Sequence, residues 1–326
     1  MKNYNKLSIF NNTKSVCLLT HIEPDTDALA SCVVLRDLLK SFFKIPKVDI
    51  FAECSTLSET NKLILGNIHI NKKISNYNTA VMIDCPNTER LGEYTQLFNN
   101  AKNKIVIDHH ATNTYQGDIN IVEIISSTCE IIYSICKHFK YTLNSKQKAK
   151  IYAGIITDTN NFTVGNITSK TFAIASEFEK EINRSDIYAT FLNNRSLKNF
   201  QLLSLAIQNI VTFDHNQIIV THITHEEAQK YKASFNDYYG IINQLATINS
   251  AKLICFIKPI NNDYYVGMRA KNGLNVASIA KNFGGGGHTG AAAFVSSKSI
   301  QLIEQDILIK FRDELSKFKP KPTKLF

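Results

Sequence analysis

Short apolar runs alternate with stretches of helical periodicity in the first half of the chain. From Ala28 to Phe43, apolar residues recur at helical spacing and predict an amphipathic helix. The runs around it are short and almost wholly apolar, as in strands that are buried on both faces of a parallel sheet. They are Ser15 to Thr20, Val48 to Ala52, Thr79 to Ile83 and Ile105 to Ile107. This alternation predicts an α/β fold with a doubly wound, mostly parallel sheet.

The second half of the chain has a different pattern. Helical segments end near Leu192, and a long apolar segment from Ser196 to Ile210 follows them. Beyond Val211 short strands and short helices alternate, with helices expected at Asp237 to Ile248 and Val276 to Phe283. We therefore predict three parts: a domain at residues 1–190, a helical linker at residues 191–211 and a smaller α/β domain at residues 212–326.

Composition narrows the class of protein. The seven cysteines include no Cys-x-x-Cys pair, which favours free thiols over a disulfide framework or a zinc ribbon. No segment is apolar for the ~18 residues that a membrane span needs, and Met1 to Lys6 lacks the apolar run of a signal peptide. We expect a soluble, cytoplasmic protein with no membrane contact.

The net charge of +9, from 37 Lys and Arg against 28 Asp and Glu, favours phosphorylated or nucleic-acid partners. A lysine- and asparagine-rich composition would give the same charge without any such partner, so charge leaves both interpretations open.

Carboxylates and imidazoles gather where the predicted strands and one helix end. Buried together without cations, such groups would repel one another, because like charges in a low dielectric drive pKa values apart or unfold the site. Single members have plainer explanations, since Asp25 or Asp27 could cap the helix that follows. The whole set comprises His21, Asp25, Asp27, Asp84, Asp108, His109, His110 and Asp158.

The mixture of ligands indicates the kind of metal. Carboxylates with a minority of imidazoles and no thiolate suit Mn²⁺ or a similar ion better than structural zinc. Two ions ~3.5–4 Å apart that share a bridging carboxylate can activate water and stabilise an in-line displacement at phosphorus. The chemistry alone therefore predicts phosphoester hydrolysis with two Mn²⁺, or with Mg²⁺ or other divalent ions in their place.

A glycine run lies in the smaller predicted domain. Gly284 to Gly287, followed by His288, would let backbone amides approach an anion closely. Arg269 lies upstream and can contact phosphate with two parallel hydrogen bonds. We expect Arg269, Gly285, Gly286, Gly287 and His288 to bind substrate; a hinge loop with a chance histidine is the alternative.

These motifs, in this order, resemble those of the DHH/DHHA1 phosphoesterases. The resemblance rests on His21-Ile22-Glu23-Pro24-Asp25-Thr26-Asp27-Ala28, Asp84, Asp108-His109-His110, Asp158 and Gly284-Gly285-Gly286-Gly287-His288, and it covers nearly the whole chain. In length and layout the chain is most similar to the small bacterial members, the nanoRNases (NrnA-type oligoribonucleases) and pAp phosphatases. After Asp158 the family commonly has Thr-Gly-x-Phe, whereas this chain has Thr159-Asn160-Asn161-Phe162.

The resemblance implies a role for each residue. One Mn²⁺ would be held by His21, Asp25 and Asp84. The other would be held by Asp27, Asp84, His109 and Asp158, with Asp84 as the bridge. His110 would contact the scissile phosphate and Asp108 would orient a histidine, so that Asp84, Asp108 and His110 are the expected catalytic residues. Arg269 and His288, in the DHHA1 domain, would bind substrate phosphates across a cleft from the DHH domain.

The predicted function is therefore Mn²⁺-dependent hydrolysis of very short RNA to mononucleotides, of 3′-phosphoadenosine-5′-phosphate (pAp) to AMP, or of both. The alternatives are a cyclic or linear di-adenylate phosphodiesterase and a non-catalytic nucleotide- or RNA-binding module on the same fold. The expected partners are short RNA oligonucleotides, pAp or related nucleotides, with a homodimer as one form of assembly.

Overall fold

A computed structural model describes residues 4–54, 56–70 and 73–317. The chain divides into two compact units, residues 1–194 and 195–326, and each is described by itself. The division at Asn194 falls within the segment predicted as a linker, and the helix of that segment, α8 (Leu197–Gln208), lies in the second unit.

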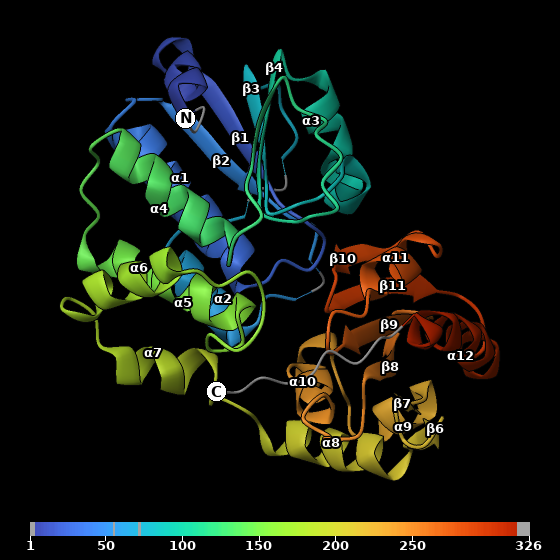
Figure 1. Ribbon diagram of the computed structural model, residues 1–326. Helices are drawn as coiled ribbons and strands as arrows, with labels where there is room; N and C mark the ends of the chain where they lie inside the picture. Colours follow the sequence, from blue (N-terminus) through green and yellow to red (C-terminus); the bar gives the residue numbers. More distant parts are fainter. Residues whose placement is uncertain (1–3, 55, 71–72, 318–326) are drawn as a thin grey trace. The chain divides into compact units, whose positions relative to one another are not determined.

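The first unit contains a five-stranded, wholly parallel sheet (Figure 1). Its strands are β1 (Ser15–Leu19), β2 (Lys47–Phe51), β3 (Thr79–Ile83), β4 (Asn103–Asp108) and β5 (Ile119–Val122), in the order β2-β1-β3-β4-β5. The predicted doubly wound parallel sheet is confirmed. The edge strand β5 was not predicted, because it is short and only Ile121 of its residues is buried.

Successive side chains of the central strands enter two different cores, as expected of a sheet covered on both faces. In β4, Ile105 and Ile107 pack on one face and Val106 on the other. The first face is covered by α1 (Thr26–Ser41), α4 (Thr128–His138) and α5 (Ser145–Asp158). The second is covered by η2 (Thr88–Tyr94) and α3 (Thr95–Asn100). Figure 1 shows α1 and α4 on one side of the sheet and α3 on the other. Burial on both faces explains why these strands are continuously apolar.

The other helices of the first unit are η1 (Tyr4–Asn12), α2 (Glu59–Leu65), α6 (Ser169–Glu179) and α7 (Arg184–Phe191). Several start at polar caps. Asn144 and Gln147 form a capping box at the start of α5, which satisfies backbone donors there. The start of α5 is thus fixed by local sequence, while its other end delivers Asp158 to the site.

The second unit contains a six-stranded mixed sheet in the order β10-β11-β9-β8-β7-β6. Its strands are β6 (Val211–Phe213), β7 (Ile218–His222), β8 (Leu253–Ile260), β9 (Asp263–Ala270), β10 (Gly286–His288) and β11 (Ala291–Ser296). Its core residues fall in two separate clusters. One contains residues of α8, α9 (His225–Lys230), η3 (Phe235–Tyr238) and α10 (Ile241–Leu245). The other contains residues of α11 (Val276–Lys281) and α12 (Ile300–Ser316).

Two details of the second unit differ from the sequence prediction. The single helix expected at Asp237 to Ile248 is wrong, because Gly240 takes a left-handed conformation (φ 76°) that separates η3 from α10. The sequence predicted no strand in the glycine run, but Gly286–His288 forms β10, which pairs antiparallel with β11. A Cβ atom on Gly287 would lie 2.5 Å from the carbonyl oxygen of Ala291, so glycine is needed there for close strand pairing.

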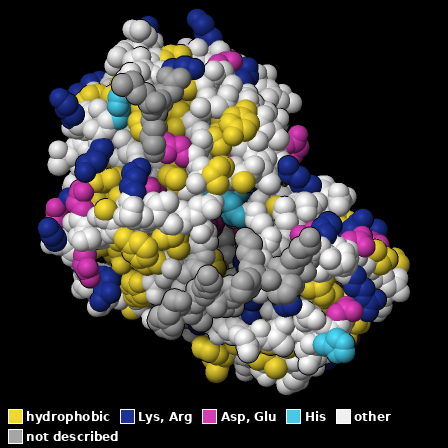
Figure 2. Space-filling model, in the orientation of Figure 1, with side chains coloured by type: hydrophobic (Ala, Val, Ile, Leu, Met, Phe, Trp, Pro, Cys, Tyr) yellow, Lys and Arg dark blue, Asp and Glu magenta, His cyan; other side chains and the backbone are white. Residues whose placement is uncertain are grey.

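Across the described ranges, no helix combines the length and the apolar character that a membrane crossing requires. All seven cysteines are free, as the sequence predicted. Figure 2 shows Lys and Arg side chains dispersed over the visible face and interspersed with Asp and Glu.

Candidate functional site

The turn between β1 and α1 carries His21, Asp25 and Asp27. Asp25 is the N-cap of α1, and its carboxylate accepts a hydrogen bond from the Ala28 amide at 3.0 Å. Asp27 is inside the first turn of the helix and is 1% exposed. The prediction that one of the two aspartates caps this helix is confirmed for Asp25, which leaves Asp27 for other contacts.

Asp27 lies at the N-terminus of a second helix, α4. Its two oxygens accept hydrogen bonds from the backbone amides of Thr128 (2.8 Å) and Cys129 (2.9 Å). These amides have no partner within the helix, and the helix dipole favours a negative charge at that end. α5 also approaches here, since a Cβ atom on Gly154 would lie 2.9 Å from Asp27 Oδ1 and would collide with the sulfur of Cys129. Asp27 is therefore held rigidly by three helices.

Asp84 follows β3 directly and is 2% exposed. Its backbone takes a left-handed conformation (φ 54°), and its amide donates to the carbonyl of Ile107 in β4. Asp84 Oδ1 lies 3.4 Å from His109 Nε2, while Oδ2 lies 3.9 Å from His21 Nε2. Thr128 donates its hydroxyl hydrogen bond to Oδ1 at 2.8 Å. Asp84 therefore presents one oxygen to each of two imidazoles that approach from different elements.

Both imidazoles are oriented by backbone carbonyls. His21 Nδ1 lies 2.9 Å from the carbonyl oxygen of Ile22, and His109 Nδ1 lies 3.2 Å from that of Ile125. Because a carbonyl can only accept, each Nδ1 carries the hydrogen, and in the neutral ring the lone pair is on Nε2. Each Nε2 faces carboxylate oxygens, an arrangement that is repulsive until a cation or a proton lies between them. Histidine ligands of metals are commonly oriented by such carbonyls.

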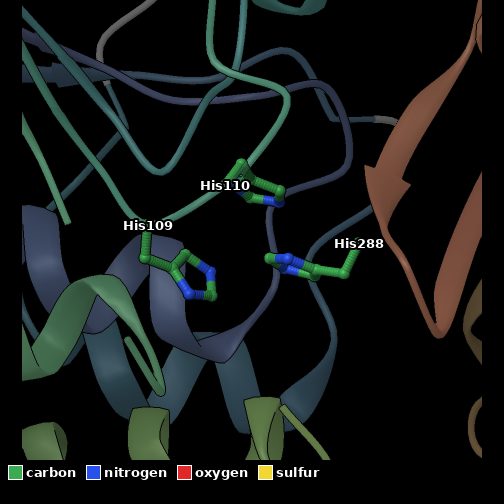
Figure 3. A group of neighbouring side chains, drawn as sticks. All are labelled: His109, His110 and His288. Atoms are coloured by element: carbon green, nitrogen blue, oxygen red, sulfur yellow. The ribbon is translucent and has the colours of Figure 1, made fainter. Parts of the chain in front are cut away.

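Asp108 and His110 form a separate pair at the end of β4. His110 Nδ1 lies 2.7 Å from Asp108 Oδ1, and the side-chain amide of Asn113 donates to Oδ2 at 2.6 Å. The carboxylate of Asp108 is fully buried. The rings of His109 and His110 are 4.7 Å apart and meet edge to face (Figure 3). Asp108 thus directs its carboxylate at His110, the contact that an orienting residue would make.

Asp158 is the last residue of α5, and its Oδ2 lies 3.5 Å from His109 Nε2. The next turn is unusual, because Asn160, Asn161 and Phe162 all have positive φ values between 44° and 59°. Thr159 holds this turn, with its hydroxyl oxygen accepting from the Phe162 amide at 3.0 Å. The turn lies where the family commonly has glycine after Thr, and asparagine tolerates its left-handed conformation better than most residues.

Three groups of these side chains could hold a metal ion. In each group the ligand atoms lie within 4.8 Å of one another. The groups are His21, Asp25 and Asp84; Asp27, His109 and Asp158; and Asp84, Asp108 and His110. Asp84 belongs to two groups and also contacts His109 of the remaining one. The donors are oxygen and imidazole nitrogen, which fit a divalent ion of the Mn²⁺ or Mg²⁺ type.

The electrostatics of the site also favour the binding of a cation. Burial, with the nearby charge of Asp27, raises the pKa of Asp84 well above its ordinary value. Burial also raises the pKa of Asp158 to about 7, although His109 opposes this shift. For Asp108 burial acts in the same direction, but His110 and Asn113 outweigh it and hold the pKa at about 2. A divalent ion would offset the repulsion among the raised carboxylates.

Two contact residues could not be found from sequence. Thr128 donates to Asp84, and Asn113 donates to Asp108. Nothing in the sequence connects Thr128, the first residue of α4, or Asn113 with the site. Cys85, next to Asp84, packs in the core on the η2 side of the sheet, and its sulfur lies 3.1 Å from the Asn87 carbonyl oxygen.

The predicted substrate-binding residues lie in the second unit. Arg269 in β9, Ala291 in β11 and His288 in β10 are directly opposite one another across three neighbouring strands. Directly opposite residues share one face of a sheet, so Arg269 and His288 project to the same side with only an alanine methyl between them. Asn243 accepts from Arg269 Nε at 3.0 Å. The structure thus places these two side chains on one face of the sheet, with the glycine run contributing the edge strand.

Comparisons with known proteins agree with this architecture. The model of the DHH family, N-terminal domain, matches residues 15–158, and the model of the DHHA1 domain matches residues 215–317. An uncharacterized protein of Mycoplasma genitalium is 25% identical over 96% of this chain and 93% of its own length. Another protein of that organism, named bifunctional oligoribonuclease and PAP phosphatase NrnA, is 26% identical over 93% of this chain and 92% of its own length.

Among solved structures, an exopolyphosphatase-related protein of Bacteroides fragilis aligns with a TM-score of 0.82 at 22% identity, over 97% of this chain and 96% of that one. This likeness shows a shared fold. The two domain models together match most of the chain, in the order that the motifs predicted. The chain therefore belongs to the DHH family, with a DHH N-terminal domain followed by a DHHA1 domain.

Proposed function

We propose that this phosphoester hydrolase of the DHH family cleaves very short RNA oligonucleotides to mononucleotides, pAp to AMP, or both. The observation that carries the proposal is the position of Asp84, a buried carboxylate with one oxygen toward His21 and the other toward His109. A carboxylate that faces two sets of ligands is suited to bridge two cations. The names of the relatives, bifunctional oligoribonuclease and PAP phosphatase, supply the substrate class.

We assign the metal ligands as the motifs suggest. His21, Asp25 and Asp84 would hold one ion, and Asp27, Asp84, His109 and Asp158 the other. Oxygen and imidazole donors favour Mn²⁺, with Mg²⁺ as an alternative. When bound, such a pair of ions supplies an activated water and stabilises charge at phosphorus.

The protein's own residues would position the substrate. His110 would contact the scissile phosphate, with its ring oriented by Asp108, whose Oδ1 lies 2.7 Å from Nδ1. A histidine with this support is a suitable donor to a phosphate oxygen. In the second unit, Arg269 and His288 would bind substrate phosphates, with the amides of Gly285, Gly286 and Gly287 beside them. The domains predicted at residues 1–190 and 212–326 would thus divide metal binding from substrate binding.

A cellular location and an assembly state belong to the proposal. Seven free cysteines, six of them buried, suit a reducing compartment such as the cytoplasm. The homodimer stays a prediction.

A substrate panel tests the proposal. The purified chain would be assayed with Mn²⁺, Mg²⁺ or chelator on a 5′-labelled RNA ladder of two to five nucleotides, on pAp, and on linear and cyclic di-adenylates. We expect Mn²⁺-dependent release of mononucleotides from the shortest RNAs, of phosphate from pAp, or of both. Activity on di-adenylates alone would contradict this substrate class and would favour a di-adenylate phosphodiesterase. Binding without turnover on every substrate would favour a non-catalytic module.

Asp84→Ala tests the metal site, because it removes the proposed bridge, and Glu59→Gln is its control. The metal content and activity of Asp84→Ala should both collapse while its circular dichroism spectrum stays that of a folded protein. Glu59→Gln, at an exposed carboxylate of the same unit, should retain both.

A further inference from the structure

A lysine in the second unit is buried on the same face of the sheet as Arg269. Lys258 lies in β8 and is 9% exposed. Ile254 of β8 is opposite Arg269 of β9, and Lys258 is opposite Tyr265. Because side chains alternate along a strand, Ile254 and Lys258 project to one face, together with Tyr265 and Arg269. Two cationic side chains therefore share the face that also carries His288.

Aromatic rings surround the Lys258 ammonium group. Its nitrogen lies 3.8 Å from the centre of the Phe235 ring, 5.0 Å from that of Tyr265 and 5.3 Å from that of Tyr238. Phe235 and Tyr238 come from η3, which covers this face of the sheet. Ring faces attract a cation, but they accept no strong hydrogen bond from the three ammonium donors.

No anion balances this lysine in the part of the chain that the structure describes. There the side-chain ammonium group of Lys258 makes neither an ion pair nor a hydrogen bond. The nearest acidic residue of η3, Asp237, is engaged by the Ser234 amide at 2.8 Å and by Lys198 at 3.4 Å. The Tyr238 hydroxyl is also buried, and it too has no hydrogen-bond partner among the described residues.

An unbalanced buried ammonium group is costly. Burial, with a smaller contribution from the positive charge of Arg269, lowers the pKa of Lys258 to about 7. A bound anion would favour the charged form and would give the ammonium donors an acceptor. An anionic group bound beside Lys258 and Arg269 would thus be stabilised by two cations on one face of the sheet.

We propose that Lys258, Arg269 and the aromatic walls formed by Phe235, Tyr238 and Tyr265 make a second anion subsite, which binds a substrate phosphate other than the one that is hydrolysed. The proposal deepens the proposed function and rests on it for the identity of the anion. Short RNA with a 5′ phosphate and pAp both carry a second phosphate, whereas a dinucleoside monophosphate such as ApA carries only one. The subsite would therefore select short substrates by their second phosphate.

The test compares Lys258→Met with the wild-type full chain on pApA and ApA in Mn²⁺. Methionine keeps the unbranched stem among the rings and removes the charge. We expect KM for pApA to rise about tenfold, as for loss of a charge-assisted hydrogen bond, with kcat within twofold. KM for ApA should change less than twofold. If ApA is not turned over, its inhibition constant against pApA is measured in place of KM.

The matched control is Lys298→Met, which removes the same charge from an exposed ion pair with Asp306 in the same unit. It should leave KM for pApA within twofold. Equal effects of the two variants would assign the loss to overall charge and overturn the subsite. An unchanged KM in Lys258→Met, in a folded variant, would show that the lysine only packs against the rings.

A second measurement does not depend on turnover. The NMR signal of the Lys258 ε-carbon is assigned by its absence in Lys258→Met. Its chemical shift would be followed against pH in the chelator-treated full chain, with and without saturating pAp. Tenfold tighter binding to the charged amine corresponds to a rise of about one unit in the pKa of Lys258. An unchanged midpoint with pAp bound would overturn the subsite. If the wild type hydrolyses no substrate, the proposed function fails, while this titration still decides the subsite.

Discussion

At the scale of single residues, the carboxylates of the site differ in their pKa values because they have different neighbours. Asp84 and Asp27 face imidazole and helix amides, whereas Asp108 is engaged by His110 and Asn113. The same residue type therefore has opposite pKa shifts within one site, raised for Asp84 and lowered for Asp108. The cause is the surroundings: burial among other carboxylates in the first case, and a histidine with an amide donor in the second.

Asp108→Asn tests the orienting role. The substitution keeps the size of the side chain but removes the charge that holds His110 Nδ1. We expect kcat to fall about 10–100-fold with metal content unchanged by elemental analysis, because the groups around Asp27 and His21 stay intact. Loss of metal together with activity would instead make Asp108 a ligand.

Lys258 gives a prediction about stability and pH. The unfolded chain keeps the lysine proton up to the ordinary pKa of 10.5, while the folded chain releases it above about 7. Between these values the unfolded chain binds more protons, so this residue makes stability rise with pH. Lys258→Met should be more stable than wild type at pH 6 by about 1–4 kcal/mol.

That advantage should shrink by up to about 1.4 kcal/mol per pH unit as pH rises above 7. Urea unfolding of both proteins at pH 6, 7.5 and 9 would measure it. A difference that stays constant with pH would mean that Lys258 has an ordinary pKa in the folded protein.

At the scale of elements, the contact between α1, α4 and α5 holds Asp27 in place. Asp27 lies in the first turn of α1, and its oxygens accept from the first amides of α4. α5 passes close enough that Gly154 has no room for a side chain. The geometry of the metal groups therefore depends on contacts between helices that are distant from one another in sequence.

Gly154→Ala should disturb both packing and site. The added methyl collides with Cys129 and lies 2.9 Å from Asp27 Oδ1. We expect a loss of about 1–3 kcal/mol in the free energy of unfolding and weaker metal binding by calorimetry. Cys129→Ala in the same chain should recover part of the stability but not the contact with Asp27. Unchanged stability in the single variant would show that the helices can separate at no cost.

At the scale of the whole molecule, the two units carry different chemistry. Every metal group considered above lies in the first unit, and the cationic face of Arg269, Lys258 and His288 lies in the second. This separation predicts that metal binding and substrate affinity can be changed independently.

Arg269→Ala should raise KM for short RNA or pAp about tenfold or more while metal content stays at the wild-type level. Asp84→Ala should instead lose its metal. Arg312→Ala, at an exposed arginine of the second unit, is the control and should change neither. Loss of metal in Arg269→Ala would contradict the division of roles.

The sequence by itself determined the α/β class and most of the strand positions. Strands such as Thr79–Ile83 are almost wholly apolar because every position is buried, so their pattern is local and can be recognised in the sequence. The polar residues at strand ends, from His21 to Asp158, also stood out, because a buried strand followed by carboxylates is unusual. The chemical class of the site followed from residue types alone.

Tertiary structure decided what each of those residues faces. Only the fold brings Asp27 to the start of α4 and aligns Arg269 with His288 across three strands. It also broke the helix expected at Asp237 to Ile248, since Gly240 leaves the helical region, and so placed Phe235 and Tyr238 over Lys258. These contacts join residues distant in sequence, and packing and burial, which create them, leave no periodic signal along the chain.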